Sequence, residues 1–151
     1  KNKKSLRSKR MTPDQIDKVQ ASFAQVVPIK AAAAELFYAR LFEIAPQVRP
    51  MFKGDMTEQG AKLMATLGAV VNGLKNLDAI VPVAEKLAVG HVAYGVKAAH
   101  YPFVGAALID TLEKGLGDGF TPDVQSAWEA AYTTLSGVMI AAAYPEAEAA
   151  E

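Results

Sequence analysis

Two histidines that lie nine positions apart are the side chains best suited to chemistry in this sequence. His91 and His100 bound the stretch "HVAYGVKAAH", and neither has an acidic residue, a cysteine or another histidine beside it at metal-ligand spacing. A zinc site made of side chains needs three or four ligands, whereas the chain has two histidines and no cysteine. A single inward histidine would suffice only for a cofactor that brings the other ligands. Haem does so, with four porphyrin nitrogens and one axial imidazole.

Three polar side chains interrupt otherwise apolar helix faces. His91 shares a face with Leu87 and Ala88, Tyr38 lies among alanine, leucine and phenylalanine, and Gln59 precedes Leu63 by one turn. Buried polar groups are costly unless they are partnered. Each could be an ordinary structural residue: a core histidine, a tyrosine bonded to a backbone carbonyl, and a glutamine exposed near a helix start. Taken singly, none requires a functional role.

Helical signals dominate the elements that must position these side chains. "TPDQ" from Thr12 and "TPDV" from Thr121 each join an N-cap threonine to a first-turn proline. Pro28, Pro46, Pro82 and Pro102 also fit first-turn positions. The pattern predicts an all-α protein with helices over residues 12–27, 29–44, 47–51, 57–76, 79–91, 101–116 and 122–143.

Length and composition favour one soluble intracellular domain. The chain has 151 residues, enough to bury a core without crosslinks. The lack of cysteine excludes disulfides, iron–sulfur clusters and thiol nucleophiles, and it agrees with a cytoplasmic location. No apolar run approaches the length of a membrane span, and no secretory signal opens the chain. We therefore expect no membrane span.

The formal net charge of zero hides an uneven distribution. Residues 1–10 hold six of the sixteen basic residues and no acid, so the rest of the chain carries ten basic and sixteen acidic residues, a net charge of −6. A basic arm could bind nucleic acid or an anionic membrane surface, but the body has no matching basic groove. We interpret residues 1–10 as a leader or tag, residues 11–144 as the folded domain and residues 145–151 as an acidic tail, and we expect no nucleic-acid partner.

Four segments together resemble a known family. They are "LFYARLFEIAPQVRPMF", "QGAKLMATLGAVVNGLKNLDAI", "GHVAYGVKAAHYPFVG" and "AWEAAY". In order and spacing they are similar to the bacterial single-domain haemoglobins of the globin superfamily and to the haemoglobin domain of flavohaemoglobins. The resemblance implies a three-over-three globin fold in residues 11–144 and a haem b cofactor (iron protoporphyrin IX).

The resemblance also implies roles for individual residues. His91 becomes the proximal iron ligand, Phe52 the aromatic residue packed flat against the porphyrin, and Tyr38 and Gln59 the polar pair that stabilises a bound gas. Tyr101, Tyr132 and Leu87 fall around His91, whereas His100 is expected to be an exposed cap or turn residue. The full set of expected cofactor-binding residues is His91, Phe52, Leu63, Leu67, Leu87, Val96, Tyr101 and Val104.

The sequence departs from flavohaemoglobins at two points. Their final helix carries a glutamate that bonds the proximal histidine, and Ala143 stands at that place here. We expect the Nδ1 proton of His91 to be donated to a carbonyl near Leu87 instead. The chain also has no Gly-rich dinucleotide loop, so a catalytic cycle that needs electrons would require a separate reductase.

The leading functional hypothesis is reversible binding of O2, and also of CO and NO, at a pentacoordinate or water-ligated iron, for oxygen storage, delivery or scavenging. A nitric oxide dioxygenase that uses a separate reductase is the enzymatic alternative, with weak peroxidase activity a further one. A gas sensor acting through a partner and a haem-free interaction module are the other readings. The sequence leaves a monomer and a homodimer equally open.

Overall fold

The computed structural model describes residues 11–52, 54–93 and 98–143. All regular structure in these ranges is helical, which confirms the predicted all-α class. None of the helices in this part of the chain combines the length and apolarity that crossing a membrane requires. The expected leader at residues 1–10, the acidic tail at residues 145–151 and Val96 lie outside the described residues.

Six α-helices and four short 3-10 helices make up the described fold. The α-helices are α2 (Pro13–Val26), α3 (Lys30–Ile44), α4 (Met56–Asn72), α5 (Leu77–Ala93), α6 (Tyr101–Leu116) and α7 (Pro122–Ala143). The 3-10 helices are η1 (Val27–Ile29), η2 (Pro46–Met51), η3 (Ala98–His100) and η4 (Gly117–Gly119).

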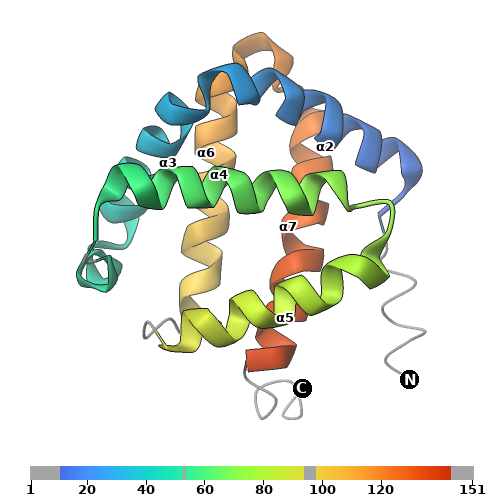
Figure 1. Cartoon of the computed structure of the whole chain (residues 1–151). Coiled ribbons are helices and arrows are strands. Elements are labelled where there is room, and N and C mark those ends of the chain that lie inside the picture. Colours follow the sequence, from blue (N-terminus) through green and yellow to red (C-terminus); the bar gives the residue numbers. More distant parts are fainter. Residues whose placement is uncertain (1–10, 53, 94–97, 144–151) are drawn as a thin grey trace.

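The helices form two layers of three. In Figure 1, α4 and α5 run across the front, while α6 and α7 pass behind them at a steep angle. Helix α3 packs on α6 and α4, and α7 packs on α2 and α5. The two front helices meet at their connection and diverge from it, so the start of α4 and the end of α5 are the ends farthest apart (Figure 1).

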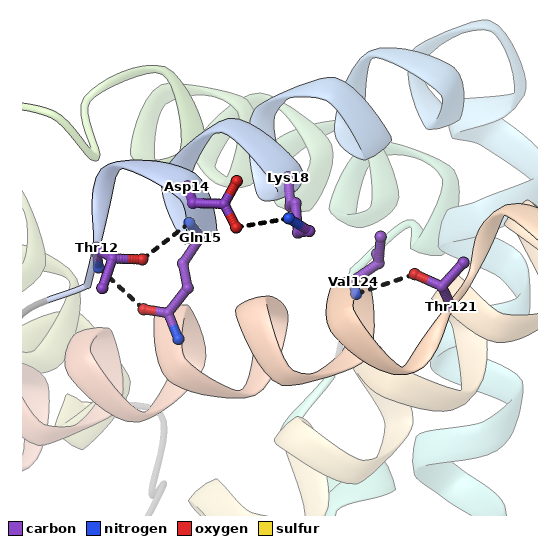
Figure 2. Close-up of polar contacts among 6 residues, drawn as sticks. All are labelled: Thr12, Asp14, Gln15, Lys18, Thr121 and Val124. Atoms are coloured by element: carbon purple, nitrogen blue, oxygen red, sulfur yellow. Dashed lines mark hydrogen bonds and ion pairs between the residues drawn. The ribbon is translucent and has the colours of Figure 1, made fainter.

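The expected helix starts are present at Thr12 and Thr121. The Gln15 N–H donates to the Thr12 hydroxyl at 3.1 Å, and the Gln15 side-chain oxygen accepts from the Thr12 N–H at 3.0 Å (Figure 2). The Val124 N–H donates to the Thr121 hydroxyl at 3.2 Å. These bonds satisfy backbone donors that the first helical turn leaves open.

The connection between α4 and α5 differs from the prediction. Helix α4 ends at Asn72 rather than near residue 76, because the Gly73 N–H is shared between the carbonyls of Ala69 and Val70, both at 3.1 Å, and the chain then turns. Helix α5 therefore begins at Leu77, and Pro82 lies inside it rather than in its first turn. Pro82 is exposed, so its ring does not occupy space in the core.

Trp128 is the centre of the larger of two apolar clusters. Its side chain is 2% exposed, and its Nε1–H donates to the Ser22 hydroxyl at 2.8 Å. That bond ties α7 to α2 and satisfies the one polar atom of a buried indole. Residues from α2, α3, α4, α5 and α6 also belong to this cluster. The smaller cluster gathers around Phe37, Tyr38 and Leu41 of α3.

Gly60 allows α3 and α4 to approach closely. A Cβ atom at Gly60 would lie 2.9 Å from the Cβ of Ala34, closer than real side chains come. Because Tyr38 follows Ala34 by one turn and Gln59 precedes Gly60, this crossing brings the two predicted polar residues together.

Candidate functional site

His91 lies near the end of α5 and is half-buried. Its Nδ1 is 2.7 Å from the carbonyl oxygen of Leu87, one turn earlier. A carbonyl oxygen can only accept a hydrogen bond, so Nδ1 carries the proton and donates it. In the neutral ring this leaves the Nε2 lone pair available to bind a metal ion. The contact with Leu87 is the one predicted from the sequence.

Tyr101 and Tyr132 lie on the same side of the fold as His91. The Tyr101 and His91 ring centroids are 6.5 Å apart, with 32° between the ring planes. The Tyr132 hydroxyl donates to the Tyr101 carbonyl oxygen at 2.5 Å. Burial raises the pKa of Tyr132, with the neighbouring Tyr101 adding to the effect and the backbone of Gly105 opposing it. Tyr132 is therefore a neutral hydrogen-bond donor that fixes the first residue of α6.

Gly105 sets how closely α6 approaches the Tyr132 ring. A Cβ atom at position 105 would lie 2.7 Å from Cε2 of Tyr132. An aromatic ring held at its hydroxyl end cannot move aside cheaply. Nothing in the sequence pattern had singled out this glycine.

The side chains of Tyr38 and Gln59 lie near each other between α3 and α4. Tyr38 is 7% exposed and Gln59 is half-buried. Burial raises the pKa of the Tyr38 hydroxyl, and the Gln59 side-chain hydrogen bond works in the opposite direction. The hydroxyl therefore stays protonated at neutral pH. The structure thus brings together two polar residues that are 21 positions apart in the sequence.

Phe52 belongs to an aromatic group around Tyr38. Its ring centroid lies 5.3 Å from that of Tyr38 and 5.3 Å from that of Phe42, both edge to face. Arg49 covers the outer side of this group, with its guanidinium carbon 5.1 Å from the centre of the Phe42 ring. The sequence had placed Phe42 on the same helix face as Tyr38 and had predicted Phe52, but it had not singled out Arg49, because only the fold brings that side chain to the Phe42 ring.

Four further apolar residues of the predicted set are half-buried rather than fully buried. Leu67 of α4 and Leu87 of α5 pack against the cluster around Trp128, whereas Leu63 of α4 and Val104 of α6 pack against the smaller cluster. These four residues belong to α4, α5 and α6. Covering their partly exposed side chains with a flat apolar molecule would remove apolar surface from water, which is favourable.

His100 is a turn residue, as expected, but it is half-buried rather than exposed. It occupies the N-cap of α6 without a side-chain bond to that cap. Within the described residues, no three histidine, cysteine or acidic side chains gather in a way that could hold a metal ion. His91 therefore has no protein-only metal cluster around it in this part of the chain.

A groove with a volume of about 520 Å³ lies between α6 and α7. Tyr101 and Tyr132 are the two members of the predicted site that contribute to its wall, and Asp110 and Glu129 give it negative charge. A smaller apolar cavity of about 50 Å³ lies between α4, α5 and α7. Neither holds the polar pair of Tyr38 and Gln59.

Fold and site together define an all-α protein of the three-over-three helical class, with a carbonyl-bonded histidine on α5 and a tyrosine–glutamine pair between α3 and α4. Residues 35–139 match the Globin family, and the chain belongs to that family.

Curated relatives and solved structures agree with this assignment. The chain is 32% identical over 123 residues to a flavohemoprotein of Rhodopirellula baltica, covering 77% of this chain and 30% of that protein. It is 29% identical over 135 residues to a flavohemoprotein of Vibrio cholerae, covering 86% of this chain and 34% of that protein. The chain thus spans about a third of the length of these relatives.

The fold is similar to that of a bacterial globin from Campylobacter jejuni, with a TM-score of 0.78 and 26% identity over 91% of this chain and 99% of that one. It is also similar to an engineered carbene transferase based on a candidate nitric oxide dioxygenase of Rhodothermus marinus. There the TM-score is 0.80 and the identity 27%, over 93% of this chain and 99% of that one.

Proposed function

We propose that this globin binds haem b and, through it, reversibly binds small diatomic gases, with O2 as the principal ligand and CO and NO as others. The bond of 2.7 Å between His91 Nδ1 and the Leu87 carbonyl carries this proposal. It fixes the tautomer in which Nε2 is free, which is the form that an axial ligand must have. The flavohemoproteins among the relatives support the choice of cofactor.

The residues present fit this group. His91 would be the protein ligand, and the half-buried side chains of Leu63, Leu67, Leu87 and Val104 would pack on the ring faces together with Phe52. Tyr101 would pack beside the His91 imidazole. Haem, when bound, supplies the iron at which a gas can bind. The protein side contributes orientation, apolar packing and exclusion of water.

Tyr38 and Gln59 have the chemistry to select among gases. The Tyr38 hydroxyl and the Gln59 amide can both donate hydrogen bonds. Tyr38 is buried among aromatic rings and Gln59 is half-buried, and a donor shielded from water interacts more strongly with a partly negative ligand than it would in water. Of the three gases, O2 develops such negative charge on binding most strongly. One such bond contributes about 1 kcal/mol, or roughly a fivefold slower dissociation. The pair therefore favours O2 retention.

Nitric oxide dioxygenation is the second candidate function. Its support is the similarity to flavohemoproteins and to the Rhodothermus marinus protein. The backbone carbonyl at His91 argues for a weaker version of that chemistry, because a neutral acceptor draws less on the imidazole proton than a carboxylate would. That reaction also needs electrons, which a reductase would have to supply.

Absorption spectra of the ferric, ferrous and ferrous–CO forms test the proposal. A Soret band and a ferrous–CO spectrum typical of histidine ligation are expected, together with a stable oxygenated form in air. A purified chain that takes up no haem would contradict the proposal. Consumption of NO at the rate of an enzyme, in the presence of a reductase and O2, would favour the second function over the first.

A further inference from the structure

Arg49 is an exposed residue that makes two hydrogen bonds with the backbone of Phe52. The Phe52 N–H donates to the Arg49 carbonyl oxygen at 3.1 Å, and the Arg49 Nη1 donates to the Phe52 carbonyl oxygen at 2.9 Å. Phe52 follows η2 and precedes α4, so no helix holds its carbonyl. Arg49 thus holds the Phe52 N–H through its own carbonyl oxygen and the Phe52 carbonyl oxygen through its side chain.

The Arg49 guanidinium also restrains the ring next to Phe52. Its central carbon lies 5.1 Å from the centroid of Phe42, a distance typical of a cation–π contact. The Phe42 and Phe52 rings meet edge to face, with 5.3 Å between centroids. Arg49 therefore limits the movement of Phe52 through its backbone and through its aromatic neighbour.

No carboxylate competes for this guanidinium in the part of the chain that the structure describes, because the four ion pairs there involve other residues. A planar guanidinium can lie on an aromatic ring and still donate to a carbonyl from its edge. A lysine ammonium is a point charge without such a face. The two contacts of Arg49 therefore depend on its shape as well as on its charge.

We propose that Arg49 is a positioning residue for Phe52 and that it slows the loss of haem from the folded protein. This inference rests on the proposed function, because it needs Phe52 to pack against haem. Arg49 acts through Phe52 and itself need not touch the cofactor. Nothing in the sequence pattern, the family match or the relatives assigns a role to this position.

The test compares three variants with the wild type. Arg49→Gln removes the charge and the planar fork, Arg49→Lys keeps the charge alone, and Lys62→Gln removes an exposed charge from α4 as a matched control. The measurements are the rate of ferric haem transfer to an excess of a haem-scavenging apoprotein and the thermal unfolding of each haem-free chain. A variant that loses haem faster without unfolding at a lower temperature has a defect in holding the cofactor, whereas a variant changed in both measurements has lost general stability.

Arg49→Gln is expected to lose haem at least about fivefold faster, as fits the loss of one charge-assisted bond. Its haem-free form should unfold close to the wild-type temperature. Arg49→Lys should fall between Arg49→Gln and the wild type, and Lys62→Gln should match the wild type. If Arg49→Gln does not fold, Arg49→Lys carries the same comparison. Haem loss unchanged in both Arg49 variants, or accelerated equally in Lys62→Gln, would overturn the proposal.

A double-mutant cycle with Phe52→Leu identifies the route of the effect. If Arg49 acts through Phe52, then adding Arg49→Gln to Phe52→Leu should change the rate by less than about twofold. An undiminished effect in that background would refute the positioning role while leaving haem binding intact. The wild-type Soret band is read first. Its absence would instead refute the proposed function, and this inference with it.

Discussion

Nδ1 of His91 lies 2.7 Å from the carbonyl oxygen of Leu87, one turn earlier in α5. Both partners belong to the same helix, so the bond forms wherever that helix forms. It defines the imidazole tautomer without help from a distant residue. The proximal side of the proposed site is therefore built into α5.

Replacing His91 tests the proposed ligand. His91→Ala is expected to be purified without haem, because the substitution removes the imidazole whose Nε2 is proposed to bind the iron. The control is His100→Ala, which should keep its haem because His100 is a turn residue at the start of α6. The ratio of Soret to protein absorbance measures both. A wild-type Soret band in His91→Ala would exclude His91 as the ligand.

Replacing Tyr38 tests the polar pair. Tyr38→Phe removes one hydroxyl and keeps the ring contacts with Phe37, Phe42 and Phe52. Dissociation of O2 should become faster by about fivefold, the equivalent of one hydrogen bond. Dissociation of CO, which carries less charge, should change less. Stopped-flow mixing gives both rates, and an unchanged O2 rate would remove Tyr38 from the ligand-stabilising role.

Two glycines provide a matched pair for packing near Tyr132. Gly105→Ala would place a Cβ atom 2.7 Å from Cε2 of Tyr132 and is expected to lower the free energy of unfolding by about 1–3 kcal/mol. Gly137→Ala, in α7, meets nothing within 4 Å and should raise it by about 0.5–1 kcal/mol. Urea denaturation of the two variants measures the difference. Equal effects in both would show that the Tyr132 contact carries no strain.

Tyr132 should make stability depend on alkaline pH. Burial raises the pKa of its hydroxyl above the ordinary value of 10.0. Above pH 10.0 the unfolded chain loses this proton while the folded chain keeps it. The contribution of Tyr132 to the free energy of unfolding is therefore complete below that pH and decreases as the pH rises above it. Tyr132→Phe should make the fall shallower by at most about 1.4 kcal/mol per pH unit.

Urea denaturation between about pH 8 and about pH 11 measures these slopes. The hydrogen bond to the Tyr101 carbonyl is lost in Tyr132→Phe at every pH, so the comparison uses the slope and not the absolute stability. Parallel curves for the two proteins would mean that Tyr132 ionises normally in the folded state.

The sequence by itself determined the helices and the identity of the polar residues. The caps at Thr12 and Thr121 and the bond from His91 to Leu87 join atoms no more than four residues apart, so local geometry is enough to predict them. Pro82 shows the limit of such signals. It lies inside α5 at an exposed position, and only packing decides which helix face is exposed.

Only the tertiary structure decided which distant residues meet. The contact of Gly60 with Ala34 sets the crossing of α3 and α4, and with it the proximity of Tyr38 to Gln59. The contact of Arg49 with Phe42 also depends on the fold, because it requires η2 to place Arg49 beside α3. Helix crossings depend on side-chain volumes at the contact point rather than on local propensity. For that reason the sequence could suggest the members of the site, but their mutual contacts had to be found in the folded chain.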